Sequence, residues 1–482
     1  MTIKEKTIGW NFDNSYSNLP KSFIYEISPV PVKRPELVIF NHDLAEQMGL
    51  NFSNVDNEQL AKMFSGNLLP KGSKSLAQAY AGHQFGHFTM LGDGRAVLLG
   101  EHISKSNQRL DVQFKGSGQT PFSRNGDGRA ALGPMLREYL ISEAMYSLNI
   151  PTTRSLAVVK TGENVIREKT LQGAILTRVA SSHIRVGTFQ FIRTRENLDE
   201  LNTLVNYTIK RHYPEISKSK NNAYDLLSKL IDRQIELVVN WMRVGFIHGV
   251  MNTDNMAISG ETIDYGPCAF MDSYNLGTCF SSIDHMGRYA YGNQPAITKW
   301  NLARFAECLL TLINPKKDDA LKMATELIDK FDKIYEEKWF NMMKSKLGLI
   351  GDDKEDNLII FELLEIMKKQ ELDYTNTFLF LMDHEIDDKK SYQNEEFDNW
   401  KMKWQKRLTK DSKNLMELNN PVIIPRNHNV ENVLKSAENY DLTPFNDLLK
   451  ALKNPYTNKK VLTKYQSPSH KSNEKYQTFC GT

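Results

Sequence analysis

The segment at residues 246–266, FIHGVMNTDNMAISGETIDYG, constrains the chain more than any other stretch. It has the pattern of a short loop between two apolar pieces, followed by a turn and a strand that runs into Asp264. Asp254, Asn255 and Asp264 carry oxygen ligands of the kind that Mg²⁺ takes, usually together with nucleotide phosphates. The segment therefore predicts a site for a divalent cation and a polyphosphate. The alternative is an Asp- and Asn-rich turn stabilised by side chain to backbone hydrogen bonds.

The spacing of the polar residues in this segment is that of a protein-kinase metal site. Kinases carry His-x-Asp, four residues, then Asn, and later Asp-Phe-Gly. His248 and Asn255 keep that spacing, and Asp264 begins the Asp-Tyr-Gly that stands for the second motif. Val250 occupies the position of the kinase base and cannot accept a proton, and the nearest carboxylate is that of Asp254. The segment thus predicts kinase-like metal binding with a different treatment of a hydroxyl nucleophile.

A strand and a helix upstream offer the residues that kinases use to hold phosphates. Alternation at 111–115 predicts a strand ending at Lys115, and a loop with four glycines follows. Residues 130–148 show an apolar stripe at helical spacing, and Glu138 lies on that helix. A strand-end Lys paired with a helix-borne Glu aims an ammonium group at phosphates. A surface Lys and a solvated Glu are the alternative.

Gly92, Gly94 and Arg95 belong to a turn that precedes an expected strand at 96–100. Two glycines at a turn let the backbone approach a ligand closely. The same pattern is common in a plain hairpin, so the turn alone does not decide between the two.

Two histidines precede this turn. His83 and His87 are four residues apart, so a helix would put both imidazoles on one face. There is no Glu in the metalloprotease arrangement and no obvious third ligand, and the glycines at 82 and 86 weaken a helix. Packing and hydrogen bonding are therefore expected for this pair rather than metal binding.

Two further strands are expected at 155–160 and 174–180, and two arginines accompany them. Arg178 lies in the second strand and Arg185 in the segment after it. An Arg within an otherwise apolar strand needs an anion, either a carboxylate or a phosphate. The spacing does not choose between these two.

The composition and patterning divide the chain into four parts. Residues 1–75 are expected to be an irregular N-terminal segment, and 76–190 a mainly β lobe with the glycine loops. Residues 191–345 are expected to form a helical lobe with the metal loop, including a long buried helix at 224–244. Residues 346–482 are expected to be further amphipathic helices and a polar tail. The predicted fold class is α+β with two lobes.

Composition excludes several classes of protein. Of 482 residues, 40% are hydrophobic and 25% charged, which is typical of a soluble globular protein, and the net charge of +3 implies neither a nucleic-acid nor a membrane partner. The apolar runs are too short to span a membrane, and the N-terminus has no apolar signal region. The four cysteines lack C-x-x-C spacing, which argues against a zinc site or disulfide scaffold. A cytoplasmic enzyme is expected.

With these pieces in order, the chain resembles the selenoprotein O family of protein adenylyltransferases, a branch of the protein-kinase-like fold. The matching motifs run from about residue 75 to the C-terminus in family order. They are LGDGRA at 91–96, QFKGSG at 113–118, FSRNGDGRA at 122–130, HGVMNTDNM at 248–256, DYGP at 264–267, RYAYGNQPA at 288–296 and PRNH at 425–428, with a late cysteine.

The resemblance implies transfer of AMP from ATP to hydroxyl side chains of protein substrates, with release of pyrophosphate and with ATP bound in reverse relative to kinases. It implies Asp254 as the proton acceptor, Glu138 as the residue that orients Lys115, and Asn255 and Asp264 as ligands of Mg²⁺, or of Mn²⁺. The nucleotide-binding residues that it implies are Gly92, Gly94, Arg95, Lys115, Asp127, Gly128, Arg178, Arg185 and Asp264.

Three other functions remain open from the sequence. An ordinary kinase would move the γ-phosphate, and Val250 argues against it. Uridylylation with UTP and manganese would use the same site. A pseudokinase would bind nucleotide and act as an interaction platform. Animal family members carry selenocysteine where this chain has Cys480, so a regulatory disulfide with Cys279 is a further hypothesis, against a free thiol on a loose tail.

Overall fold

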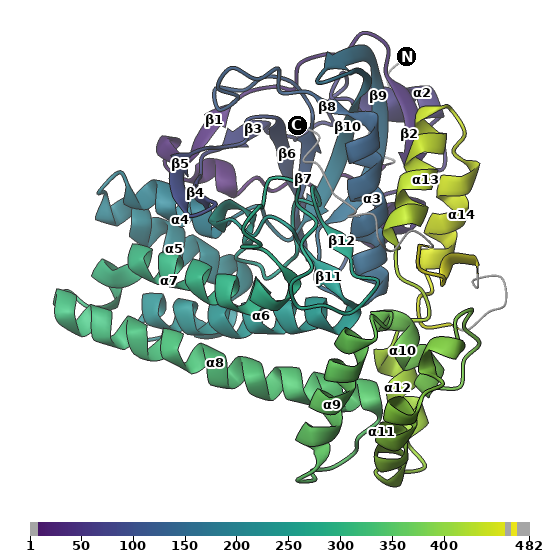
Figure 1. Cartoon of the computed structure of the whole chain (residues 1–482). Coiled ribbons are helices and arrows are strands. Elements are labelled where there is room, and N and C mark those ends of the chain that lie inside the picture. Colours follow the sequence, from purple (N-terminus) through teal and green to yellow (C-terminus); the bar gives the residue numbers. More distant parts are fainter. Residues whose placement is uncertain (1–7, 458–463, 470–482) are drawn as a thin grey trace.

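The computed structural model describes residues 8–457 and 464–469. An antiparallel β-sheet occupies the N-terminal part, and most of the later elements are helices (Figure 1). The predicted α+β class is confirmed, with a mainly β lobe followed by a helical one.

The main sheet has the strand order β1-β3-β6-β7-β10-β9-β2, and β8 pairs with β10. All of its strand pairs are antiparallel. The strands predicted at 96–100, 111–115, 155–160 and 174–180 all lie within it. Its members are β1 (Ile24–Glu26), β2 (Glu36–Phe40), β3 (Leu76–Gln78), β6 (Ala96–Ile103), β7 (Arg109–Lys115), β8 (Ala130–Ala131), β9 (Arg154–Ile166) and β10 (Thr170–Ala180).

Helix α3 (Leu132–Ser147) is the predicted helix of this lobe and packs against β9 and β10. Its apolar stripe is buried, since Leu136 and Leu140 are fully inaccessible to solvent. The helix carries Glu138 toward the strand that ends at Lys115. Burial of this stripe therefore fixes the position of Glu138 relative to the sheet.

The N-terminal segment contains short strands and short helices. It contributes β1, β2 and two helices, α1 (His42–Met48) and α2 (Asn57–Phe64), and β2 pairs with β9 at the edge of the main sheet. Asn41 and Asp56 cap the two helices through side-chain oxygens, which is the usual role of these residue types.

The helical lobe is organised around α6 (Asn222–Val244), the long buried helix that the sequence predicts. The Asn221 side chain caps its start, and Gly245, with a φ of 71°, ends it. Helix α6 packs against α5, α7 and α8. The remaining helices of this lobe are α4 (Val186–Arg193), α5 (Leu198–His212), α7 (Gln294–Ile313) and α8 (Lys317–Leu347).

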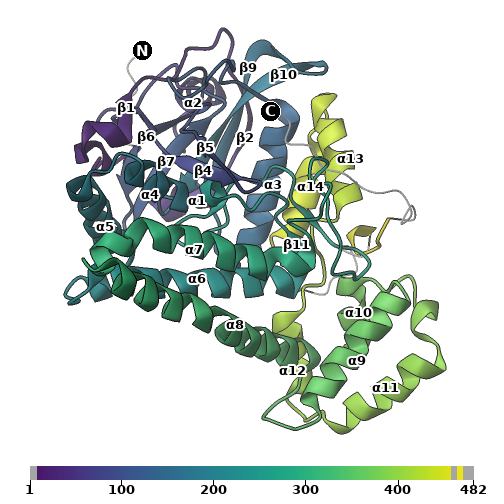
Figure 2. The same ribbon diagram turned by 60° about the vertical axis from the view of Figure 1, so that its left-hand side comes forward.

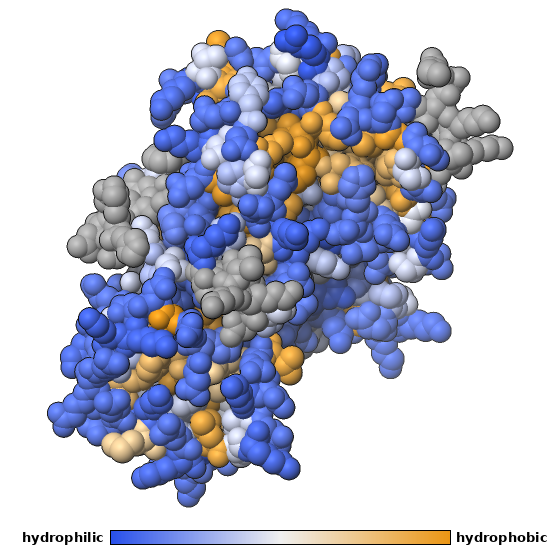
Figure 3. Space-filling model, turned by 90° about the vertical axis from the view of Figure 1, so that its right-hand side faces the viewer, coloured by the Kyte–Doolittle hydropathy of each residue, from blue (hydrophilic) through white to orange (hydrophobic). Residues whose placement is uncertain are grey.

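The C-terminal helices extend away from this lobe and then return to the sheet (Figures 1 and 2). Helices α13 and α14 pack against α3, and Asn427 at the start of α13 bonds to Phe270, which follows the 246–266 segment. The face that carries these helices is mostly hydrophilic, with separate hydrophobic areas (Figure 3). The helices are α9 (Asp356–Lys369), α10 (Tyr374–Leu381), α11 (Glu395–Lys406), α12 (Ser412–Asn419), α13 (Asn427–Glu438) and α14 (Thr443–Leu452).

The two histidines whose spacing would suit one helix face lie on a β-hairpin. Strands β4 (Ala81–Gln84) and β5 (His87–Met90) pair with each other around a tight turn at Phe85 and Gly86, which both have positive φ. Because side chains alternate along a strand, His83 and His87 point to opposite faces of the hairpin. The segment is not helical: Gly86 lies in the turn and Gly82 lies in strand β4.

Candidate active site

The segment at 246–266 forms a loop held by His248. Strand β11 (Phe246–Ile247) leads into it and pairs with β12 (Ala269–Phe270). The buried His248 ring donates from Nε2 to the Ile263 carbonyl (2.9 Å), and its Nδ1 accepts the Val250 N–H (3.4 Å). Burial lowers the pKa of His248, which agrees with this neutral tautomer. The His248 ring therefore connects the two ends of the loop through hydrogen bonds of both its nitrogens.

Asp254 lies in a short helical turn at Thr253–Asn255 and is almost completely buried. Its Oδ1 atom has no hydrogen-bond partner among the described residues. Burial raises the pKa of Asp254 to about 6. The carboxylate is thus an acceptor with capacity left for a proton or a cation.

Asn255 donates from Nδ2 to the Val250 carbonyl (3.0 Å), which leaves its side-chain oxygen for another partner. Val250 itself is buried and has no titratable group. The structure therefore has an apolar side chain at the position where a kinase carries its base.

Asp264 faces the pair formed by Lys115 and Glu138. The Lys115 ammonium lies 2.6 Å from Glu138 Oε2 and also contacts Asp264 Oδ1. Burial alone would raise the pKa of Asp264, but the charge of Lys115, followed by those of Arg95 and Arg178, holds it well below its usual range. Asp264 is an ionised acceptor whose side chain is 31% exposed, whereas Glu138 is 2% exposed.

Arg178 belongs to the same cluster. Its guanidinium lies 3.2 Å from Glu138 Oε1 and 3.7 Å from Asp264 Oδ1, and it donates to Gln113 Oε1 (2.7 Å). Two cations, Lys115 and Arg178, thus meet two carboxylates in a largely buried site. The sequence left open whether Arg178 pairs with a carboxylate or a phosphate. In the structure it pairs with the carboxylate of Glu138.

Arg185 approaches the loop from a different side. It donates to the Asp254 carbonyl (3.1 Å), and its guanidinium lies over the Tyr80 ring at 4.3 Å from the centroid. The side chain is buried and has no salt-bridge partner among residues 8–457 and 464–469. It is a cation with capacity for an anion beside the metal loop.

The Gly92–Gly94 turn packs against the loop that follows β7. A Cβ at Gly92 would lie 2.3 Å from Cγ of Phe122, so no larger residue fits there. The Ser123 hydroxyl donates to the Gly94 carbonyl, and the Gly116 N–H to the Arg95 carbonyl (2.7 Å). Both glycine loops therefore form one unit, with Arg95 close enough to Asp264 to affect its pKa.

Asp127 and Gly128 lie at the far end of this unit. Asp127 accepts two hydrogen bonds from Arg167 (2.8 and 3.0 Å), which hold its pKa below the usual value. Its side chain is 45% exposed. The Gly128 carbonyl accepts the Gly118 N–H (3.0 Å) and closes the loop. No contact joins Asp127 to Lys115 or Asp264 in the described part of the chain.

Sequence reasoning missed the residues that cover Asp254. A Cβ at Gly82 would lie 2.3 Å from Asp254 Oδ1, and the His83 N–H donates to Thr253 Oγ1 (2.7 Å). His83 Nδ1 also accepts from Gln190 (2.7 Å). The hairpin thus forms one wall of the site. The glycine at 82 is the available signal, although in the sequence it indicates only a weakened helix.

The residues around the loop fit a magnesium ion in part. Hard cations take oxygen ligands, and Asp264, Asn255 and the unpartnered Asp254 oxygen are such donors on one loop. No group of three or more His, Cys, Asp or Glu side chains in the described residues would hold a metal alone. Mg²⁺ keeps few protein ligands and completes its shell with water and phosphate, so a few oxygen donors of this kind would be enough to hold it.

Cys279 is half-buried and contacts Asp284, whose carboxylate adds to burial in raising the pKa of the thiol to about 11. Cys480 lies outside the described residues, so the disulfide hypothesis stays untested. In the described part of the chain, no helix has the length and apolar character needed to span a bilayer.

Together, a buried Lys–Glu pair between strand and helix and an Asp–Asn loop beside it are groups of the kind that enzymes of nucleotide phosphates use, with the apolar Val250 at the position of the kinase base. Residues 6–453 match the family model described as protein adenylyltransferase SelO. The chain belongs to this family of nucleotidyltransferases, and its membership confirms the resemblance.

Two relatives are described as protein nucleotidyltransferase YdiU. The protein from Pelagibacter ubique is 64% identical over 99% of this chain and 100% of its own length. The protein from Nitrosococcus oceani is 55% identical over 100% of this chain and 99% of its own length. Among solved structures, ROP2 from Toxoplasma gondii, described as having a protein-kinase fold and no enzymatic activity, matches 68% of this chain and 86% of its own at 10% identity. Its TM-score of 0.25 is too low to support an argument.

Proposed function

We propose that the protein transfers AMP from ATP to a Ser, Thr or Tyr hydroxyl of a protein substrate. The hydroxyl oxygen bonds to the α-phosphorus, the bond from that phosphorus to the bridging oxygen breaks, and pyrophosphate leaves. The proton of the hydroxyl passes to Asp254, whose Oδ1 has no other partner. A bound Mg²⁺, held by Asn255 and Asp264, would neutralise phosphate charge.

The observation that carries the proposal is the position of the cations. Lys115 and Arg178 lie together at Glu138, and Arg185 lies beside Asp254. When ATP binds in the orientation opposite to that in kinases, buried cations contact the departing pyrophosphate and the α-phosphate faces the acceptor hydroxyl. Removing one such contact typically costs a factor of about 10² to 10³ in rate. Glu138 orients Lys115, and the Gly92–Arg95 and Asp127–Gly128 loops enclose the nucleotide.

The absence of a base at Val250 supports transfer at the α-phosphate over an ordinary kinase reaction. Phosphoryl and nucleotidyl transfer depend more on positioning and charge than on strong deprotonation. Uridylylation with UTP and Mn²⁺ would use the same groups, because none of the contacts described above reads the base. A pseudokinase that only binds nucleotide would need fewer of these charged and metal-binding groups.

The test is to incubate the protein with an acceptor protein and ATP labelled at the α- or the γ-phosphate. We expect label from the α-position only, and none with Asp264→Ala. Label from the γ-position alone would mean a kinase, and nucleotide binding with neither label would mean a pseudokinase. A parallel arm with α-labelled UTP, in Mg²⁺ and in Mn²⁺, separates adenylylation from uridylylation.

A further inference from the structure

The hairpin of β4 and β5 has one strand edge whose backbone groups point outward. The His83 N–H donates to Thr253 Oγ1 and therefore points away from β5. Phe88 is the residue opposite His83, and opposite residues of an antiparallel pair point their backbone groups the same way relative to the ladder. The Leu91 N–H, which donates to the Tyr80 carbonyl (3.0 Å), confirms the alternation. The N–H and C=O of Phe88 and Met90 therefore face away from β4.

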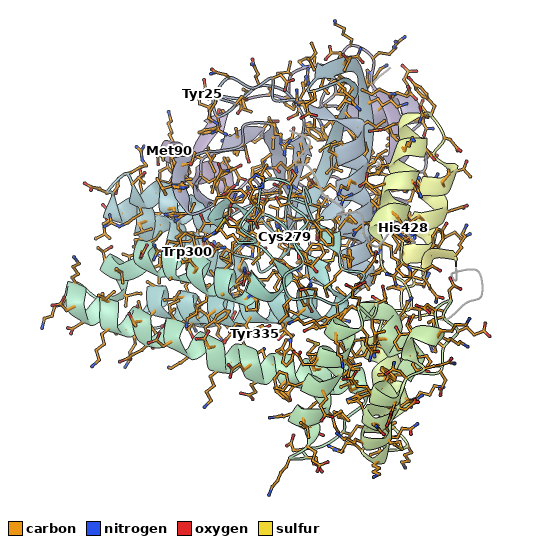
Figure 4. The ribbon with its side chains drawn as sticks, in the orientation of Figure 1. Tyr25, Met90, Cys279, Trp300, Tyr335 and His428 are labelled. Carbon is orange, nitrogen blue, oxygen red and sulfur yellow. The ribbon has the colours of Figure 1, made fainter. Side chains whose placement is uncertain are left out.

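This edge of β5 is open. In the described residues, no hydrogen bond from outside the hairpin reaches the backbone of Phe88 or Met90. Their side chains are 45% and 49% exposed, and Figure 4 shows Met90 at the outer rim of the molecule. Proteins protect such edges by keeping the strand very short, or with proline, lysine or a bulge. The strand His87–Met90 is short, with four residues, but it has no proline, lysine or bulge, so its outward backbone groups are available to a further strand.

The other edge of the hairpin is fixed to the active-site loop. The Phe85 N–H donates to Asn252 Oδ1 (3.1 Å), and Gly82 lies against Asp254. Gly82 and Thr89 are opposite each other, so the face of the hairpin that bears Thr89 is turned toward Asp254. Phe88 and Met90 lie on the other face. Any strand added to β5 is thus held at a fixed distance from Asp254.

A cation without a carboxylate partner lies near the turn of the hairpin. The Arg288 guanidinium approaches Gly86, where a Cβ would lie 4.0 Å from its Cζ, and it lies over the Trp300 ring at 4.9 Å. No salt bridge to Arg288 is present among the described residues. An occupant of the β5 edge with an acidic residue near the turn would complement this charge.

We propose that an extended segment of the protein substrate docks by adding a strand to the free edge of β5. The segment carries apolar side chains at alternate positions, which pack on Phe88 and Met90, and an acidic residue toward Arg288. Strand addition of this kind gives affinity through main-chain hydrogen bonds and specificity through alternate side chains. This inference rests on the proposed function, because it assigns the substrate of that site.

The geometry also places the acceptor hydroxyl relative to the docked strand. Neighbouring strands are about 4.8 Å apart, so a strand added to β5 lies roughly 10 Å from Gly82 and from the adjoining Asp254. A Ser or Thr side chain is too short to cover that span. The acceptor residue therefore lies outside the paired stretch, a few residues along the chain from the alternating apolar residues.

The first test uses an arrayed library of twelve-residue peptides with one Ser, Thr or Tyr each, the full-length protein and α-labelled ATP. We expect the labelled peptides to share apolar residues two apart, separated from the hydroxyl residue by a few positions. Labelling of proline-rich peptides, or labelling without regard to this pattern, would overturn the proposal.

The second test removes one outward N–H with Phe88→Pro, a change that leaves the hairpin's own ladder intact because that N–H takes no part in it. The KM for the best peptide should rise about five-fold or more, with the KM for ATP unchanged. Glu26→Pro is the matched control, since Glu26 lies on the edge strand β1 and, between the paired residues Tyr25 and Ile27, points its N–H outward too. Equal KM values in both variants and the wild type would refute docking at β5.

N-methylated peptides keep the test decisive if Phe88→Pro disturbs the hairpin. In an added strand only every second amide N–H points toward β5. With the wild-type enzyme, methylation of one alternate set of amides in the apolar stretch should therefore raise the KM for the peptide, and methylation of the other set should not. Equal effects of the two sets would contradict strand addition. If no α-label reaches any protein or peptide, the proposed function itself fails. A wild-type dimer that Phe88→Pro converts to monomer would instead assign the edge to a second copy of the chain and overturn the proposal.

Discussion

Glu431 on α13 lies 2.8 Å from Arg137 on α3, and Arg137 is the residue directly before Glu138. The Arg137 guanidinium also donates to the Cys268 carbonyl (2.6 Å), in the segment that follows Asp264. One side chain thus connects the C-terminal extension, the helix that carries Glu138 and the segment after the DYG motif. The C-terminal helices are therefore part of the structure that positions the site.

Asn427 should matter for activity although it lies far from Asp254 in the sequence. Its side chain accepts the Phe270 N–H (3.2 Å) and donates to the Phe270 carbonyl (2.9 Å), so it completes the short strand β12. Asn427→Ala leaves two buried backbone groups without partners, at about 1–3 kcal/mol each before relaxation. We expect a lower free energy of unfolding in urea and weaker transfer.

Asn439→Ala is the control for this variant. Asn439 also forms a side-chain hydrogen bond, but it is exposed and bonds only to the Lys435 carbonyl in its own helix (2.8 Å). Its replacement should change neither unfolding nor activity by a measurable amount. Equal losses in both variants would mean that the contact with Phe270 has no special role.

Arg426 should be among the most costly residues to replace. It is 1% exposed and forms salt bridges with Asp272 (2.5 Å) and Asp373 (2.7 Å). Burial raises the pKa of Asp373, and the Arg426 guanidinium opposes that rise. Removing one partner of a buried ion pair typically costs about 3–5 kcal/mol, because the remaining charge has no compensation. Arg426→Ala should lower the thermal unfolding temperature by several degrees at pH 7, more than at pH 4.5, because burial raises the pKa of Asp373 and its protonation relieves the cost.

Lys344→Ala tests whether burial is the cause. Lys344 also bridges two carboxylates, Asp352 and Asp356, but Asp352 is fully exposed. We expect a much smaller loss than for Arg426→Ala in the same calorimetric measurement. A comparable loss would mean that the number of ion pairs, and not their burial, sets the stability of this region.

The Lys115–Glu138 contact could be predicted because each residue lies in an element with a strong local pattern, a strand and an amphipathic helix. The order of the motifs along the chain then indicated the lobes. The position of the β4–β5 hairpin over Asp254 could not be predicted, because the approach of Gly82 to Asp254 depends on tertiary packing. The same holds for Asn427, whose partner is the backbone of Phe270 and leaves no pattern in the side chains. Contacts of this kind lack the periodicity on which sequence reasoning depends.

Gly82→Ala should separate activity from stability. A Cβ at this position would lie 2.3 Å from Oδ1 and 2.8 Å from Cγ of Asp254, so the carboxylate or the hairpin must move. We expect transfer to fall by about 10²-fold, since displacing a reacting group by about 1 Å has that effect. The free energy of unfolding should change by much less than the roughly 2.7 kcal/mol that a 10²-fold loss of rate represents. Gly277→Ala is the control, because its Cβ would meet only the Asn275 side chain at 3.3 Å and its activity should stay near that of the wild type.

Asp93 should make stability depend on pH in an unusual direction. Burial raises its pKa to about 6 although it accepts hydrogen bonds from the Gln78 N–H (3.0 Å) and from Gln113 (3.2 Å). The folded state therefore holds a proton that the unfolded state has lost, and the contribution of Asp93 to stability falls as pH rises from about 4 to about 6. Asp93→Asn removes this dependence.

The difference in unfolding free energy between Asp93→Asn and the wild type should thus shift in favour of the variant by about 2.4 kcal/mol between pH 4 and pH 7, since each pKa unit corresponds to about 1.4 kcal/mol and part of the titration lies below pH 4. Urea titrations at four or five pH values measure this slope. Both donors bond to the same carboxylate oxygen, Asp93 Oδ2, and an Asn amide oxygen can also accept two hydrogen bonds, so the variant can keep both contacts. Any offset that is equal at all pH values leaves the slope unchanged. A difference that is constant with pH would mean that Asp93 is ionised throughout, and that the positive charges of Arg185 and Arg178 outweigh its burial.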